Sequence, residues 1–385
     1  MSTPTGRVPL AEVSDLISPG RPLPFRVLDS QGRLLLGSGH VVHDARQLAS
    51  LLERGACVEY DEAAAVRRAR AQAVGGMTSS VRKKSWFEKF DAQVLALDSL
   101  LRALGRDPGL APQIESFADE HVALTERHLD AALFVAVRHD DRRASQYSLT
   151  HALHTATVLL LTARQLGWTP ELTSRGVRAA LTMNCSMTEL QSRLAEQRDP
   201  PTRKQLEQVR GHPHASAQLL RDSGVTDVGW LALVEDHHER NGGSGYPRGL
   251  AEVDEPTHAL RAADVFVAKI TPRASHPALA PQVAARQLFQ EDQGARVGSA
   301  LIKAVGIYPP GDFVRLANGE AAVVVHRAMA GRAVQVASLL AANGKPLAGA
   351  PKRDTGQPEF AITGALADRQ GLPRVLPEVV FGVLE

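Results

Sequence analysis

The sequence predicts a mainly α-helical protein with a small α/β unit near its N-terminus and a small β domain near its C-terminus. From Trp86 to about residue 306, apolar residues recur at three- and four-residue steps, as on one face of an amphipathic helix. Residues 25–60 instead alternate short apolar runs with turn residues. After Pro309, two Asn-Gly pairs separate apolar runs, which is typical of hairpins.

Composition narrows the class of protein before any motif is considered. The chain has 385 residues, 44% of them hydrophobic, which is enough for two to three packed domains. A net charge of +2 argues against a dedicated nucleic-acid surface. The two cysteines, Cys57 and Cys185, lie far apart and indicate neither a disulfide scaffold nor a metal-binding cysteine motif.

The apolar stretches are short. The longest, Ala156 to Ala163, cannot cross a bilayer, and the first residues lack the apolar run of a secretion signal. We therefore expect a cytoplasmic protein without a membrane partner.

The N-terminal part combines a hairpin with one short helix. Phe25–Leu28 and Arg33–Leu36 flank a Ser-Gln-Gly turn, and Asp44 is placed to cap a helix that Gly55 ends. Residues 71–85 lose periodicity and collect Gly, Ser and Lys, which predicts a linker. We assign residues 1–70 to the α/β unit, 71–85 to the linker, 86–140 to a helical connector, 141–308 to the main helical domain and 309–385 to the β domain.

Two helices are expected in the connector, over residues 86–104 and 114–137. Such a pair either forms a homodimer or packs on the next domain. In the β domain, Asn318-Gly319 and Asn343-Gly344 predict two type I′ hairpin turns.

One run stands out chemically, His237-His238-Glu239 followed by a glycine-rich segment that ends in Tyr246-Pro247-Arg248-Gly249-Leu250. Trp230 to Glu239 has the pattern of a helix. Consecutive histidines point about 100° apart on a regular helix, but at a helix end they can still converge on one metal or on two adjacent metals. The glycines permit positive φ angles and a tight reversal beside that site.

This run resembles the signature of the HD-GYP family, whose usual pattern is HHE-x-x-DGSGYP-x-GL. The resemblance covers residues 145–306 and, more loosely, Pro309–Glu320. It implies an all-helical fold of the HD superfamily of metal-dependent phosphohydrolases, whose HD-GYP members typically hydrolyse cyclic di-GMP. It also implies contacts of the GYP loop with signalling proteins such as diguanylate cyclases.

Residue by residue, the resemblance implies five metal ligands and three substrate contacts. The substrate contacts are Tyr246, Pro247 and Arg273. The ligands are His151 in the opening Tyr-Ser-x-x-His, His212 in Gly-His-Pro, His237, His238, and Asp264 in Arg-x-x-Asp-x-Phe. For His151 the alternative is a helix-face histidine that contacts Asp264.

The central pair of the family is missing. Met183 stands at the histidine, Asn184 at the aspartate and Met187 at the lysine of the family's His-Asp-x-x-Lys. Two cations about 3.5–4 Å apart repel one another and need an anionic bridge, which a neutral amide does not supply. A thioether also suits Fe, Mn or Mg poorly.

Three interpretations follow. The favoured one is a degenerate HD-GYP protein that binds a nucleotide or a protein, holds one divalent metal (Fe, Mn or Zn) or none, and hydrolyses weakly or not at all. The second is an active metal-dependent cyclic-di-GMP phosphodiesterase, in which Glu189 rebuilds a carboxylate ligand. The third is a scaffold for the flanking domains. The literal His139-Asp140 pair precedes the first ligand position in a charged run, and we expect a solvated turn there.

Overall fold

The computed structural model of the chain describes residues 6–17, 22–42, 44–63, 65–66, 84–138, 146–275, 277–291, 296–328, 331–366, 372, 375–382 and 384. Contacts divide the chain into two compact units, Met1–Lys83 and Lys84–Glu385. His139, Asp140 and most of the expected linker lie outside the described residues. Among the described helices, none is long and apolar enough to cross a membrane.

The first unit is a small sheet with one α-helix. Its antiparallel strands, in the order β1 (Arg7–Pro9), β4 (Cys57–Glu59), β2 (Val27–Leu28) and β3 (Leu34–Leu36), adjoin the 3₁₀ helix η1 (Leu10–Leu16). Asp44 caps α1 (Ala45–Glu53) by accepting a hydrogen bond from Gln47 N at 2.8 Å. The hairpin and the capped helix are thus confirmed, and both pack on an apolar core of their own.

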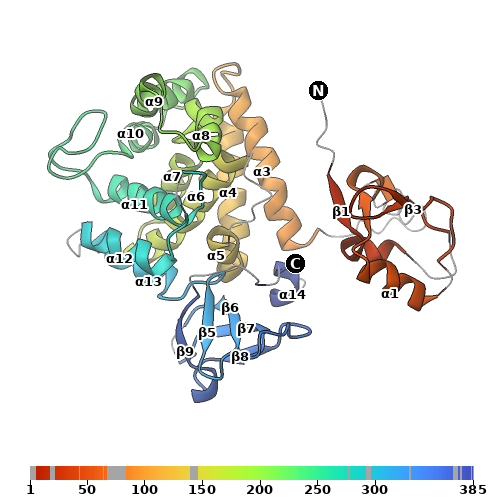
Figure 1. Ribbon diagram of the computed structural model, residues 1–385. Helices are drawn as coiled ribbons and strands as arrows, with labels where there is room; N and C mark the ends of the chain where they lie inside the picture. The colour runs from red at the N-terminus through yellow and green to blue at the C-terminus, as the bar shows by residue number, and fades with distance from the viewer. Residues whose placement is uncertain are drawn as a thin grey trace. The chain divides into compact units, whose positions relative to one another are not determined.

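The second unit is a helical body built around α6 (Tyr147–Leu166), most of which is buried (Figure 1). Gly167 ends α6 in the left-handed conformation, with φ at 73°. The helices that contact α6 most extensively are α5 (Leu129–Val137), α7 (Pro170–Thr182), α11 (Glu255–Ile270) and α13 (Arg296–Val305). The remaining helices are α3 (Trp86–Ala103), α4 (Ala111–Arg127), α8 (Thr188–Glu196), α9 (Arg203–Asp222), α10 (Val228–Asp236), α12 (Pro281–Glu291) and α14 (Pro377–Phe381). The predicted mainly helical fold class is confirmed.

One helix boundary differs from the expectation. The single helix expected over 114–137 is two helices, because His128 between α4 and α5 adopts φ −143° and ψ 70°. The break follows the polar run from Thr125 to His128, and apolar residues continue on both sides of it, so periodicity gives no boundary signal there. After α7, which ends at Thr182, the chain forms a short 3₁₀ turn, η3 (Cys185–Met187).

The C-terminal part is a five-stranded antiparallel sheet at one end of the helical body, near α5 and α13 (Figure 1). Its order is β8 (Lys352–Asp354), β7 (Gln335–Leu340), β6 (Ala321–His326), β5 (Phe313–Leu316) and β9 (Ile362–Ala365), and a short 3₁₀ turn, η4 (Pro358–Phe360), precedes β9. Phe134 of α5 shares an apolar cluster with this sheet. The β domain therefore packs directly on the helices.

The two hairpin turns are present, but the predicted type I′ geometry is wrong. In the first, Gly319 N donates to Leu316 O at 2.9 Å and Leu316 N donates to Glu320 O at 2.9 Å. Gly319 has φ 85°, whereas Asn318 is not among the residues with positive φ. A type I′ turn needs positive φ at both central residues, so this is a three-residue loop with a glycine bulge. The turn at Gly344 repeats the pattern.

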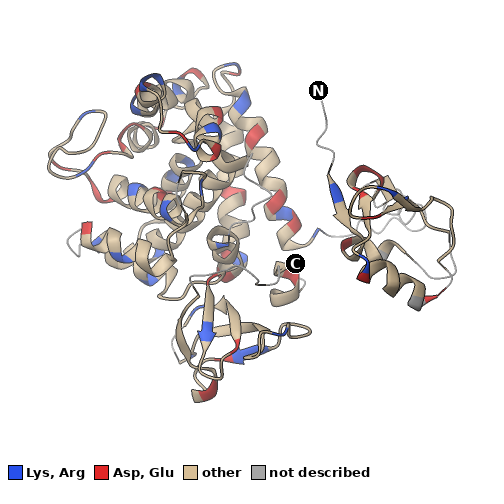
Figure 2. Ribbon diagram, in the orientation of Figure 1, with Lys and Arg blue, Asp and Glu red and all other residues tan. Residues whose placement is uncertain are grey.

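Charged residues are spread over both units rather than gathered by sign. Figure 2 shows Lys and Arg interleaved with Asp and Glu along the described helices and strands, consistent with the net charge of +2. The site chemistry therefore has to come from buried side chains.

Candidate metal centre

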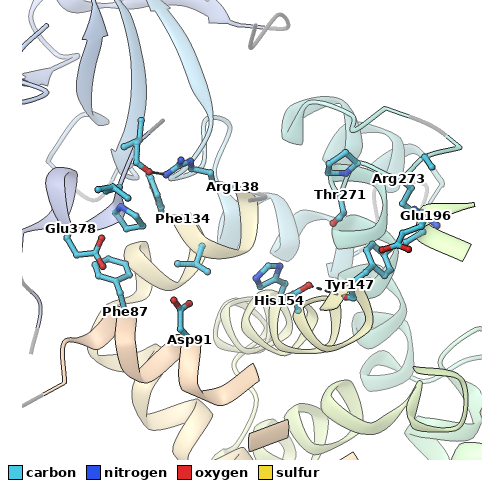
Figure 3. A pocket seen from close by; sticks show the side chains of 18 of the residues that line it. Phe87, Asp91, Phe134, Arg138, Tyr147, His154, Glu196, Thr271, Arg273 and Glu378 are labelled. Atoms are coloured by element: carbon cyan, nitrogen blue, oxygen red, sulfur yellow. Dashed lines mark hydrogen bonds between the residues drawn. The ribbon is translucent and has the colours of Figure 1, made fainter. Parts of the chain in front are cut away.

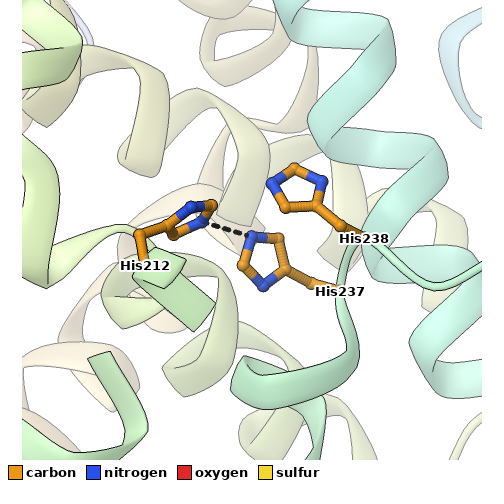
Figure 4. Close-up of side chains that lie close together, drawn as sticks. All are labelled: His212, His237 and His238. Atoms are coloured by element: carbon orange, nitrogen blue, oxygen red, sulfur yellow. Dashed lines mark hydrogen bonds between the residues drawn. The ribbon is translucent and has the colours of Figure 1, made fainter. Parts of the chain in front are cut away.

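Three histidines from two segments far apart in sequence meet inside the helical body (Figure 4). His212 lies on α9, and His237 and His238 follow the last residue of α10. Their possible ligand atoms all lie within 4.8 Å of one another. His212 and His237 are buried, with 2% and 0% of their surface exposed. The predicted meeting of these three residues is thus present in the fold.

Two of the three rings have a fixed tautomer. Nδ1 of His212 lies 2.6 Å from Val209 O, and Nδ1 of His237 lies 2.7 Å from Val234 O. A carbonyl oxygen only accepts, so each Nδ1 carries the proton and each Nε2 presents a lone pair. The two Nε2 atoms face one another at 3.1 Å, and neither can donate while both rings are neutral.

Burial keeps these rings neutral. It lowers the pKa of His212 to about 3, with a further contribution from neighbouring His237. Burial also lowers the pKa of His237 and holds that of His238 well below its usual value. Opposed lone pairs on neutral imidazoles, with the other nitrogen donating to backbone oxygen, are the arrangement of metal-binding histidines. The three residues therefore fit one divalent cation.

His151 and Asp264 form a buried pair near the three histidines. His151 Nε2, from α6, donates to Asp264 Oδ1, from α11, at 2.7 Å. Burial opposes ionisation of Asp264, but the hydrogen bond with His151 and the charges of His151, His238 and His237 outweigh it and hold the pKa of that carboxyl well below its usual range. The carboxylate in turn acts electrostatically on His212, His237 and His238. The contact agrees with the alternative interpretation of His151, and it equally fits two neighbouring ligands of one centre.

The positions of the lost His-Asp pair are also buried. Met183 is fully buried in the helical core, and Asn184 is 7% exposed. Asn184 Oδ1 has no hydrogen-bond partner among the described residues. Its turn is tied to α9, because Ser186 Oγ donates to His212 O at 3.1 Å. The orphaned oxygen is thus one more donor that fits a cation, although a neutral one.

The other residues of this turn are poorer candidates for metal ligands or reactive groups. Met187 is half-buried in η3. Glu189 is exposed to solvent, so it does not rebuild the buried carboxylate that the enzyme interpretation requires. Burial raises the pKa of the Cys185 thiol to about 12, as expected for an inert core residue.

The glycine-rich loop covers the histidines. Tyr246 stacks on His238, with ring centroids 4.6 Å apart and planes 26° apart, while Pro247 is exposed. Sequence reasoning missed the role of Glu239, which is 1% exposed. Its carboxylate accepts hydrogen bonds from three consecutive backbone N–H groups, those of residues 248–250. Its place in the His-His-Glu run was the available signal.

Arg273 lies at a different place from Tyr246. Its guanidinium sits 6.0 Å from the ring centroid of Tyr147, and Nη2 donates to Ala268 O at 3.1 Å. Arg273 and Tyr147 line a cavity of about 710 Å³, together with His154, side chains of α3 and α5, and residues 375–378 (Figure 3). None of the three clustered histidines lines this cavity. The three expected substrate contacts therefore occupy two locations.

Comparisons with known proteins show what the chain is similar to. Residues 124–301 match the family model described as "HD domain". The cyclic di-GMP phosphodiesterase PA4108 of Pseudomonas aeruginosa is 28% identical over 214 residues, covering 54% of this chain and 51% of that protein. The chain thus spans about half the length of this relative. A solved structure, Bd1817, a HDG"Y"P protein from Bdellovibrio bacteriovorus, aligns at 17% identity with a TM-score of 0.46, covering 77% of this chain and 98% of that one.

The helical body is therefore an HD domain, the class of protein that this fold and its buried histidines define. Within that class, the run from His237 to Leu250 and the similarity to a cyclic-di-GMP phosphodiesterase support an HD-GYP family member.

Proposed function

We propose that this chain is a degenerate HD-GYP protein of cyclic-di-GMP signalling, which holds one divalent metal and acts as a regulatory module with weak or no hydrolysis. The observation that carries the proposal is the cluster of His212, His237 and His238, whose two fixed Nε2 lone pairs face one another at 3.1 Å. Three imidazoles with a further open position suit Zn, Fe or Mn. A bound cation would supply Lewis acidity and lower the pKa of a coordinated water.

Weak hydrolysis follows from the residues around Asn184. Two neighbouring cations need a negatively charged oxygen between them, and Asn184 offers a neutral amide oxygen. Asp264 is ionised, but its Oδ1 is engaged by His151 Nε2. One metal site with a nearby anion is consistent with binding and with slow turnover.

The ligand and the partners are part of the same proposal. Cyclic di-GMP is favoured because the curated relative from Pseudomonas aeruginosa acts on it by name. Tyr246 and Pro247 would contact the nucleotide beside His238, and Arg273 would contact a phosphate. The exposed tip of the loop offers a surface to signalling proteins such as diguanylate cyclases. We also propose that the protein is cytoplasmic and forms a homodimer.

Metal analysis tests the proposal directly. We expect about one divalent metal per purified chain, and loss of that metal in the His237→Ala variant. His214→Ala is the matched control, because His214 lies on α9 two residues from His212 but is exposed to solvent. A metal content that is the same in His237→Ala as in the parent would contradict the proposed centre.

Incubation with cyclic di-GMP then separates binding from turnover. We expect calorimetric binding and little linear product in the presence of Mn²⁺ or Fe²⁺. The alternative, an active phosphodiesterase, is favoured by one observation, the buried and unpartnered Oδ1 of Asn184, which is a spare ligand atom. Rapid linearisation that is lost in His237→Ala would establish this alternative.

A further inference from the structure

The three histidines of the cluster are not held in the same way. The rings of His212 and His237 are each fixed by an Nδ1–H bond to a backbone carbonyl. For His238 the described residues provide ring contacts instead. Its ring lies 4.1 Å from that of His237 and 4.6 Å from that of Tyr246, centroid to centroid. The orientation of the third imidazole therefore depends on where the loop places Tyr246.

Backbone bonds from Gly242 N to Ala251 O at 2.9 Å and from Gly243 N to Leu250 O at 3.1 Å pair the two sides of the loop, and Arg248 forms an ion pair with Asp236, but none of these contacts involves Tyr246. Gly242, Gly243 and Gly249 have φ angles of 82°, 77° and 66°, and glycine backbones lose much conformational freedom when they are ordered. Most of residues 240–250 are exposed. A fixed position for Tyr246 needs a strong attachment at the base of the loop.

Glu239 supplies this attachment. Its Oε1 accepts from Arg248 N at 2.6 Å and Gly249 N at 3.1 Å, and its Oε2 accepts from Leu250 N at 2.9 Å. Hydrogen bonds to a buried carboxylate are stronger than neutral ones. The three bonds join the far end of the loop to the residue that directly follows His238.

The loop segment at Gly245 also packs on Glu239. A Cβ atom at Gly245 would lie 2.5 Å from Glu239 Cα and 2.4 Å from Arg240 N. Tyr246 N in turn donates to His238 O at 3.3 Å. Gly245 and Tyr246 thus sit directly against the chain from His238 to Arg240, which brings the tyrosine ring over the imidazole.

We propose that Glu239 is a positioning residue that fixes His238 as the third ligand by anchoring the loop 240–250. This inference rests on the proposed metal centre. It adds a route of regulation, because a partner that displaces the exposed tip would move Tyr246 and release His238, leaving His212 and His237 as a two-imidazole site. The loop then couples protein binding to metal affinity.

A cobalt titration of the full chain tests the proposal. Glu239→Gln keeps the size of the side chain but replaces one acceptor oxygen with an NH₂ group that faces backbone donors. We expect Co²⁺ affinity to fall on the order of 10–100-fold and the visible spectrum of the bound Co²⁺ to change. Asn241→Ala is the control, since Asn241 lies in the same loop and its Oδ1 accepts an exposed hydrogen bond from Val253 N, at 2.8 Å. The control keeps the parental affinity and spectrum.

Proton NMR of the metal-free chain provides a second measurement that needs no metal. The His238 ring signals, assigned by their loss in His238→Ala, carry the ring-current shift of Tyr246, and we expect Glu239→Gln to move them while Asn241→Ala does not. Unchanged His238 signals in Glu239→Gln overturn the proposal, and so does parental Co²⁺ affinity in that variant. If the parent chain binds no Co²⁺, the metal centre fails, and the NMR comparison alone decides whether Glu239 positions His238.

Discussion

Asn184 decides how many cations the site can hold. It is buried, its Oδ1 has no partner among the described residues, and its amide carries no charge. An aspartate in its place would add the negative oxygen that two adjacent divalent ions require. Under the proposed function, the number of cations that the site holds therefore depends on the charge of residue 184.

Restoring the His-Asp pair tests this statement. In the double variant Met183→His, Asn184→Asp we expect the Mn²⁺ content to rise from about one to about two ions per chain, with a gain in cyclic di-GMP hydrolysis. Atomic absorption and a chromatographic assay of the linear product measure the two effects. The single variant Met183→His, which lacks the carboxylate, is the control, and an equal rise in it would contradict the role given to Asn184.

His121 is a buried histidine outside the site, and it predicts how stability depends on pH. Its Nδ1 donates to Gln93 Oε1 at 2.9 Å, and Nε2 lies 3.3 Å from Thr157 Oγ1. The ring packs beside Phe90, and these three neighbours are all uncharged. Burial lowers the pKa of His121 from 6.5 to about 4, which favours the neutral ring in the folded chain.

The direction in which stability changes with pH follows from the protons that the folded and unfolded chains bind. Between pH 6.5 and about pH 4 the unfolded chain binds the extra proton, so the contribution of His121 is fully present above pH 6.5 and is lost as the pH falls through this window. The loss amounts to about 3 kcal/mol. Urea unfolding of the parent and His121→Gln at pH 7 and pH 4 should show the parent's advantage shrinking by that amount, whereas a constant difference would refute the assignment.

Two glycines beside the histidines should respond oppositely to an added methyl group. Gly245→Ala puts Cβ 2.4 Å from Arg240 N, a backbone atom that cannot move freely, and we expect a loss of about 2 kcal/mol and weaker metal binding. Gly211→Ala in α9 has no atom within 4 Å of the new Cβ, and we expect a gain of about 0.5–1 kcal/mol. Urea unfolding of both variants measures the two shifts, and a destabilised Gly211→Ala would show that α9 is strained there.

The elements themselves were largely predictable. The capping Asp44 and the hairpin at residues 30–32 follow from local residue chemistry. The break at His128 was missed because the apolar pattern runs through it. The turns at Gly319 and Gly344 were placed correctly but given the wrong geometry. Asn-Gly fits both a type I′ turn and a glycine bulge, and the pairing of the strands decides between them.

The whole chain consists of two units with separate apolar cores, residues 1–83 and residues 84–385. Since the histidine cluster lies wholly in the second unit, we expect a chain of residues 84–385 to fold, to keep its melting temperature and to bind the same amount of metal as the full protein. Calorimetry and metal analysis measure this. A lower metal content in the shorter chain would show that the first unit supports the site.

Residue identity and local periodicity were enough to predict the resemblance to the HD-GYP family, the helical class and the lack of a His-Asp pair at residues 183–184. Which ligand residues meet follows from the packing of the helices. This packing brings His212 to His237 and His238, and it places His151 against Asp264. It also gave Glu239 its place at the base of the loop. Such contacts depend on how α6, α9 and α11 pack, and packing across long sequence separations leaves no local signal in the chain.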